Sequence, residues 1–99
     1  MPYFAVTRER GPSWDGSRSL REQDRWDEHA EFMERLADEG FIVHGGPLGD
    51  GVRTLHMVRG ESADEIEARL ADDIWTELDL LRTASVEPWE ILLGVPNDG

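Results

Sequence analysis

Histidine is the side chain whose type and position best suit catalysis in this chain. His29 lies three residues after Trp26 and four before Met33, so a helix over 24–40 would place it on the apolar face. An imidazole in that position can act as a general acid or base when a carboxylate orients its ring, and such a pair can move a proton next to a carbonyl or hydroxyl group. A core histidine that only makes a hydrogen bond is the structural alternative.

Two other groupings suggest chemistry less strongly. His44 and His56 lie on neighbouring predicted strands, but no spacing of the H-E-x-x-H kind supports a metal site with His29, so we predict no metal. The stretch GGPLGDG (45–51) lacks the G-x-G-x-x-G spacing, and no helix opens directly after it. It predicts a hairpin turn, in which the glycines can still let a ligand approach the backbone.

Composition excludes several classes of function. The net charge of −12, from 22 acidic residues against ten basic ones, argues against nucleic-acid binding. The chain has no cysteine and its ten basic residues are all arginine, which excludes thiolate and Schiff-base chemistry. No apolar run is long enough for a membrane span, and the N-terminus does not resemble a signal peptide, so we expect a cytoplasmic protein with no membrane partner.

Hydrophobic periodicity predicts the elements of one domain over 1–99. Asp24 is the expected cap of the first helix and Gly40 its terminator, while Ser62 and Glu65 form a capping box at the start of the second. The predicted order is a strand at 3–7, a long loop at 8–23, a helix at 24–40, strands at 41–46 and 53–60 joined by a turn at 47–51, a helix after Ser62, a helical piece at 74–81, a strand at 87–95 and a frayed tail at 95–99.

This βαββαβ order predicts the α+β class, with a ferredoxin-like antiparallel sheet and both helices on one face. The other face would then be bare, yet apolar residues occupy both faces of the strands: Phe4 and Val6 alternate with Tyr3 and Ala5, and 91–93 is apolar throughout. An exposed apolar sheet needs a partner, and a homodimer that packs sheet on sheet supplies one.

Several stretches together resemble the YciI family, also called YCII-related proteins. They are WDEHAEFMERLADEGFIVHGGPL, ADDIW and SVEPWEILLG, and the resemblance covers the chain from Tyr3 to Gly94. It implies a dimeric α/β barrel of ferredoxin-like protomers, in agreement with the layout above. One branch of that family acts as a dehydrochlorinase on chlorinated aromatics, and the fold is shared with muconolactone isomerases.

The resemblance also implies a catalytic pair, in which the histidine is His29 and the aspartate is Asp73. We favour Asp73 over the neighbouring Asp72 because it keeps the family's two-residue spacing to Trp75. This chain has Ile74 where the family usually has proline, which frees the backbone after Asp73.

Candidate substrate-binding residues complete the predicted site. Gly45, Gly46 and Pro47 match the turn of the family, and Trp26 and Trp75 flank the catalytic pair in sequence. The two tryptophans can form the wall of a pocket for a flat ligand, with core packing as the structural alternative.

Two functions follow as hypotheses. The first is a small-molecule enzyme of lyase or isomerase type that uses His29 and Asp73 for acid–base chemistry on a small compound, cyclic or aromatic ones included, and needs no cofactor that the sequence reveals. The second is a dimeric protein that binds a small metabolite in the same pocket, or an accessory protein, without catalysis. The pH dependence of turnover would separate them.

Overall fold

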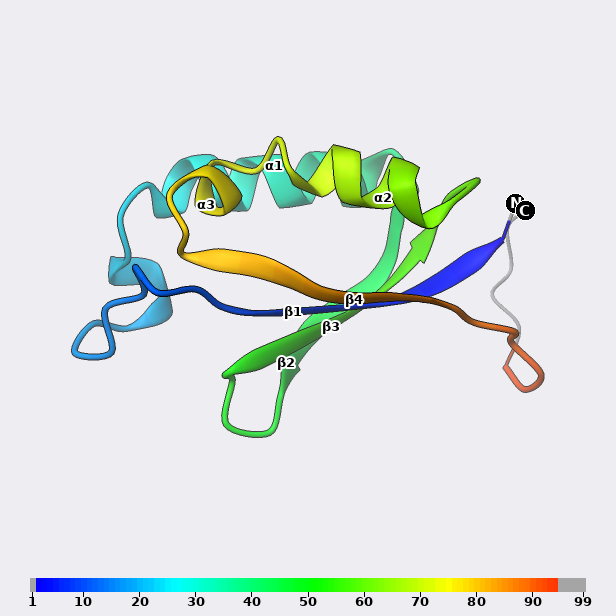
Figure 1. Ribbon diagram of the computed structural model, residues 1–99, viewed down its shortest axis with the longest axis horizontal. Helices are drawn as coiled ribbons and strands as arrows, with labels where there is room; N and C mark the ends of the chain where they lie inside the picture. Colours follow the sequence, from blue (N-terminus) through cyan, green and yellow to red (C-terminus); the bar gives the residue numbers. More distant parts are fainter. Residues whose placement is uncertain (1, 95–99) are drawn as a thin grey trace.

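The computed structural model describes residues 2–94 of the chain. A sheet of four strands forms one layer, and the helices lie together against one of its faces (Figure 1). In chain order the elements are β1 (Tyr3–Arg10), the 3-10 helix η1 (Leu20–Glu22), α1 (Trp26–Asp38), β2 (Ile42–Leu48), β3 (Arg53–Arg59), α2 (Ala63–Leu70), α3 (Ile74–Glu77) and β4 (Leu81–Pro88).

The strand order β2-β3-β1-β4, with every neighbouring pair antiparallel, confirms the predicted α+β, ferredoxin-like fold. β1 and β3 occupy the centre, and each is joined to its chain neighbour by a helical crossover or a hairpin. β1 alternates buried and half-buried positions, so Phe4, Val6 and Arg8 point toward the helices. The half-buried positions Ala5 and Thr7 therefore belong to the opposite face.

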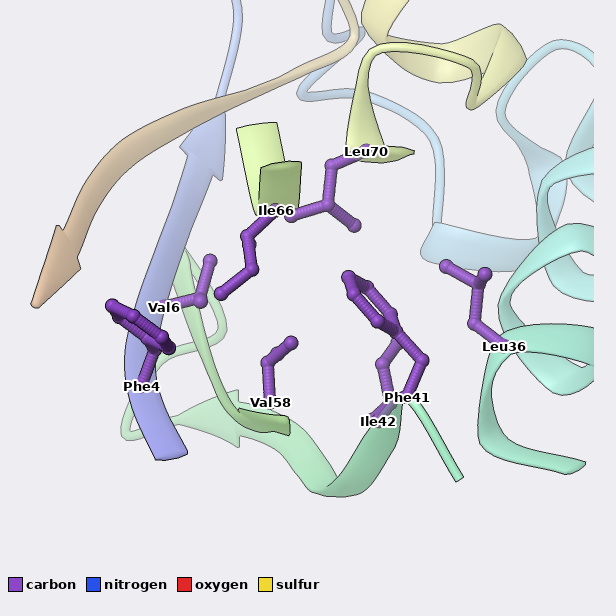
Figure 2. Close-up of a cluster of buried hydrophobic side chains, with 8 residues drawn as sticks. All are labelled: Phe4, Val6, Leu36, Phe41, Ile42, Val58, Ile66 and Leu70. Atoms are coloured by element: carbon purple, nitrogen blue, oxygen red, sulfur yellow. The ribbon is translucent and has the colours of Figure 1, made fainter. Parts of the chain in front are cut away.

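The main core lies between α2, the end of α1 and the middle of the sheet (Figure 2). Ile66 and Leu70, one helical turn apart on α2, are 0% and 2% exposed, as their spacing predicts. They pack with Val6 and Val58 from the central strands. A second cluster, built around Trp75, Leu80 and Leu81, lies toward α3.

The helix ends match the predictions in part. Gly40 follows α1 with a positive φ of 81°, which glycine accommodates as the residue after a helix. Ser62 accepts a hydrogen bond from the backbone of Glu65, as predicted, but the Glu65 carboxylate accepts from the backbone N–H of Glu61, so the reciprocal half of the capping box is shifted by one residue. The prediction that Asp24 caps the first helix is wrong, because α1 begins at Trp26 and Arg25 occupies the cap position with a left-handed backbone.

Two predicted boundaries in the first half of the chain are also wrong. The first strand continues to Arg10, so the loop begins at residue 11 and not at 8. The turn predicted at 47–51 begins two residues later, because Pro47 and Leu48 lie within β2, and Gly49 and Gly51 in the turn have positive φ. The segment expected to form a turn thus extends the β2–β3 hairpin.

The last third of the chain differs most from the prediction. The helical piece expected at 74–81 ends at Glu77, and the final strand is Leu81–Pro88 in place of 87–95. Residues 91–94 lie outside the sheet, with Leu92 and Leu93 at 75% and 91% exposure. The tail predicted at 95–99 lies outside the described residues.

The sheet face away from the helices is not covered by any element of the described chain (Figure 1). The ladder pairs Ala5 with Met57 and Thr7 with Leu55 on this face, and Leu48 near the hairpin end is 39% exposed. None of the helices in the described part of the chain has the length and apolar character that a membrane span requires.

Candidate active site

His29 and Asp73 meet in the interior although 44 positions separate them in the chain. His29 lies in the first turns of α1 and is 8% exposed, while Asp73 precedes α3 and is fully buried. The ring Nδ1 lies 2.8 Å from Asp73 Oδ2 and 3.0 Å from Oδ1. The structure thus brings together the two residues that the family resemblance selects.

The backbone at α3 fixes the direction of the Asp73 carboxylate. Asp73 is the N-cap of α3, and its Oδ1 accepts a hydrogen bond of 3.0 Å from the backbone N–H of Trp75. Ile74 begins the helix and leaves this cap intact. The neighbouring Asp72 is exposed, so only one of the two adjacent aspartates faces the interior.

Arg8 is a third member of the cluster that the sequence analysis missed. Its guanidinium is fully buried, and Nη1 donates to Asp73 Oδ2 at 2.9 Å. Nη2 donates to Thr76 Oγ1 at 2.7 Å, and that hydroxyl donates in turn to the carbonyl of Leu70. The hydrogen bonds therefore tie β1 to α3 and to the end of α2.

The electrostatics of the cluster set the tautomer of His29. Burial alone would raise the pKa of Asp73, but the hydrogen bonds and positive charges of His29 and Arg8 outweigh burial and lower that pKa below its usual value. An ionised carboxylate can only accept hydrogen bonds, so Nδ1 of His29 must carry the hydrogen. The neutral ring then has its lone pair on Nε2, where it can take a proton.

Three tryptophans hold the imidazole in place. Trp75 stacks on the His29 ring, with centroids 3.9 Å apart and planes 5° from parallel. Trp75 is fully buried, and its Nε1 donates to the carbonyl of Asp24 at 2.6 Å. Trp14 and Trp26 each contact Trp75 with a centroid separation of 5.7 Å. The ring of His29 is therefore fixed both by a hydrogen bond and by flat packing.

A cavity of about 520 Å³ adjoins the ring of His29. This volume lies within the range of small-molecule sites. The apolar stripe of α1 forms one wall, and Trp75 and the loop residue Trp14 form another. Because Nδ1 is taken by Asp73, Nε2 is the nitrogen that a molecule in the cavity can reach.

Some predicted binding residues line this cavity and one does not. Gly45, Gly46, Trp26 and Trp75 lie in its wall, whereas Pro47 does not. A side chain at Gly45 would place a Cβ 2.3 Å from Cδ2 of the His56 ring, so glycine is required for that ring to lie against β2. At Gly46 a Cβ would meet nothing within 4 Å.

His56 lines the cavity and lies outside the His29–Asp73 pair. Burial first, and then the positive charges of Arg8 and His29, lower the pKa of His56 from its ordinary 6.5 to about 4. The ring is therefore neutral at physiological pH. Within residues 2–94 no group of three or more His, Cys, Asp or Glu side chains could hold a metal ion, so the three histidines do not converge on a metal site.

The loop between β1 and α1 is ordered by one buried glutamine. Gln23 is 4% exposed, and its Nε2 donates to the carbonyls of Asp15, Arg18 and Ser19 at 2.8, 3.1 and 3.3 Å. Its Oε1 accepts from the backbone N–H of Asp15. This side chain replaces the backbone partners that a regular element would provide, and it holds the segment that carries Trp14.

No family model matches the chain, and no curated protein sequence matches it. A solved structure resembles it over most of its length. That structure is TftG, the 5-chloro-2-hydroxyhydroquinone dehydrochlorinase of Burkholderia phenoliruptrix, in complex with 2,5-dihydroxybenzoquinone. The two chains share 26% sequence identity, the similarity covers 90% of this chain and 92% of that one, and the TM-score is 0.61.

Proposed function

We propose that this protein is an enzyme acting on a small aromatic or cyclic compound, with His29 as the general acid–base and Asp73 as its orienting carboxylate. The observation that carries the proposal is the position of His29 between a buried, ionised aspartate and a cavity of about 520 Å³. A solvent-exposed histidine, or a buried one with no adjoining cavity, could not do this chemistry.

The proposed reaction begins when Nε2 of His29 takes a proton from a C–H or O–H group of the substrate. The imidazolium that forms is stabilised by Asp73, whose own charge is balanced by Arg8. The electron pair left on the substrate forms a new double bond. In an elimination it expels a leaving group as an anion, and in an isomerisation His29 returns the proton to a different atom.

The similarity to TftG supports this class of chemistry. TftG is a dehydrochlorinase of a small aromatic compound, and its structure holds a flat dihydroxylated ring. The aromatic wall of the present cavity, formed by Trp14, Trp26 and Trp75, suits a ligand of the same shape. We also propose membership of the YciI family, which the order of motifs suggests and the fold is consistent with.

We further propose that the protein is a homodimer formed through the uncovered sheet face. Ala5, Leu48, Leu55 and Met57 provide apolar surface on that face of the antiparallel ladder. Packing it against the same face of a second copy removes this surface from water and closes the two sheets into a barrel-like pair.

The experiment that tests the proposed enzyme compares the protein as it is with His29→Gln. We expect release of chloride from 5-chloro-2-hydroxyhydroquinone, measured under anaerobic conditions, and a loss of about 100- to 10,000-fold in kcat for His29→Gln. Glu31→Gln, on the exposed side of the same helix, is the matched control and should keep full activity.

Two results would count against the enzyme. Turnover that survives unchanged in His29→Gln would remove the histidine from the mechanism. Absence of chloride release, together with absence of deuterium uptake at the ring carbons of 2,5-dihydroxybenzoquinone in heavy water, would favour the function of a non-catalytic binding protein.

A further inference from the structure

The charged side chains that line the cavity are unlike the rest of the molecule. The whole chain has a net charge of −12. The cavity lining nevertheless includes two arginines, Arg8 and Arg10, and Glu34 is its one carboxylate side chain. Because the charge of Arg8 is balanced by Asp73, the recognition of an anion in this cavity would fall to Arg10.

The two arginines are not equivalent. Arg8 is fully buried, and its two Nη groups are taken up by Asp73 and Thr76. Arg10, at the end of β1, forms no ion pair with a carboxylate in the described chain, and its buried Nε has no hydrogen-bond partner there. Its guanidinium lies over the ring of Trp14, 4.6 Å from the centroid. Arg10 is therefore held in the cavity wall with donor groups still to be used.

A chain of ring contacts links His29 to Arg10. His29 stacks on Trp75 at 3.9 Å, Trp75 contacts Trp14 edge to face at 5.7 Å, and Trp14 contacts Arg10. Because His29 and Arg10 both line the cavity, a flat ligand in it could reach the imidazole with one atom and the guanidinium with another.

We propose that Arg10 is the anion-recognising residue of this cavity, so that its ligand is a flat aromatic or quinone-like molecule with an ionised hydroxyl or carboxylate group. This inference rests on the proposed function, because it assigns the substrate class of the same cavity. A guanidinium offers two parallel N–H donors to such a group, and the low polarity of the surrounding tryptophans strengthens the contact. Arg10 also lies where it can hold the negative charge that develops when His29 removes a proton.

The test compares two ring compounds of similar size that differ in charge. 2,5-Dihydroxybenzoquinone is an anion at pH 7, because its hydroxyl groups are vinylogous carboxylic acids, while 2,5-dimethoxybenzoquinone is neutral. Isothermal titration calorimetry with the full chain should show tighter binding of the anionic compound. In Arg10→Gln its Kd should rise about 10- to 100-fold, whereas that of the neutral compound should change less than about threefold.

Two further variants make the result specific. Arg10→Lys keeps the positive charge and should recover part of the anion binding that Arg10→Gln loses. Arg53→Gln removes the same charge from an exposed position of β3 outside the cavity, and it should leave both Kd values unchanged. The neutral compound also serves as an internal check that the Trp14 loop remains folded in Arg10→Gln.

The inference is overturned if Arg10→Gln weakens both compounds equally, if Arg53→Gln has the same effect as Arg10→Gln, or if the unaltered protein binds neither compound. Its failure differs from failure of the proposed enzyme. If anion binding depends on Arg10 but turnover survives in His29→Gln, the acid–base mechanism is refuted and the anion site stands. If turnover is lost in His29→Gln but binding shows no preference for the anionic compound, the anion site is refuted and the acid–base mechanism stands.

Discussion

Arg8 and Asp73 form a fully buried ion pair between β1 and the start of α3, with Nη1 2.9 Å from Oδ2 and neither side chain exposed. Asp73 therefore serves the fold and the candidate site at once, because the same carboxylate caps α3, neutralises Arg8 and orients His29. A buried pair adds little stability over an apolar pair of similar size, but the removal of one partner leaves an uncompensated charge in the interior.

We expect Arg8→Met to lower the free energy of unfolding by about 3–5 kcal/mol, because Asp73 then stays buried with only the histidine to balance it. Arg18→Met is the matched control. Its partner Asp24 is exposed and lies 3.4 Å away, so the loss of this ion pair should lower the free energy of unfolding by no more than about 1 kcal/mol. Urea denaturation of both variants measures the difference. Equal losses in the free energy of unfolding would show that burial of the Arg8–Asp73 pair does not matter for stability.

The two adjacent glycines of β2 should respond differently to the same substitution. Gly45→Ala places a methyl group 2.3 Å from the His56 ring and must displace that ring, which should cost about 1–3 kcal/mol of stability. Gly46→Ala meets nothing within 4 Å and should change stability by no more than about 0.5 kcal/mol. Thermal unfolding distinguishes them, and an equally stable Gly45→Ala protein would mean that the His56 ring moves freely.

The lowered pKa of His56 predicts how stability depends on pH. The folded protein keeps this ring neutral down to about pH 4, whereas the unfolded chain protonates it near 6.5, so the unfolded state binds more protons between these values. The free energy of unfolding should thus fall by about 3 kcal/mol as the pH is lowered from 7 to 4. The lowered pKa of Asp73 also stabilises the fold, but that stability is lost only below its ordinary pKa of 3.8, so it does not change between pH 7 and 4.

Urea titrations at several pH values, together with the NMR shift of the His56 Hε1 proton, measure this effect. In His56→Gln the fall in stability between pH 7 and 4 should largely disappear, whatever the variant's stability at pH 7. An inflection of the His56 shift near 6.5 in the folded protein would contradict the prediction.

The loop that carries Trp14 should depend on Gln23. Gln23→Ala removes the side chain that donates to three loop carbonyls, so the segment should open and trypsin should cleave faster after Arg18 and Arg21. Ser13→Ala, an exposed position of the same loop, is the control. Equal cleavage rates in the two variants would show that other contacts hold the loop.

The proposed dimer predicts a further difference between variants. Met57→Glu places a charge on the uncovered sheet face, so it should shift the protein from dimer to monomer in sedimentation or light-scattering measurements. Ala68→Glu places the same charge on an exposed position of α2 and should leave the mass unchanged. A monomeric unaltered protein at micromolar concentration would refute the interface.

The residues that sequence analysis handled well have strong local signals. Ile66 and Leu70 repeat at helical spacing after a Ser cap, and Gly40 ends α1 where the apolar repeat stops. The order of elements then determines the strand order, since few topologies suit a βαββαβ chain of this length. His29 was found for the same reason, as a polar residue at an apolar position.

The final strand was misplaced because its signal is non-local. The apolar run 91–93 has the higher strand propensity, yet Leu81–Pro88 pairs with β1 through an irregular register between Thr7 and Arg8. β4 lies at the edge of the sheet, where a mixed sequence such as LRTASVEP is tolerated. Pairing with β1, which is distant in the sequence, determines which segment forms the last strand, and a single sequence does not show that pairing.

Arg8 was missed for a related reason, since a charged residue after YFAVT reads as the end of a strand. The available signal was the period of two, because Arg8 continues the inward series of Phe4 and Val6. Its burial depends on Asp73, 65 positions away, so the arginine could be placed only once that carboxylate was known to face the interior.

The two roles of Asp73, in the fold and in the candidate site, have a consequence for homologues that lack the proposed activity. Selection for a folded chain alone would retain this aspartate, because without it both the arginine and the short helix lose their anchor. The histidine has no such safeguard, since a residue of similar volume could occupy its place against Trp75. An intact aspartate in a homologue therefore says little about its chemistry, and the identity of the residue at position 29 is the better diagnostic.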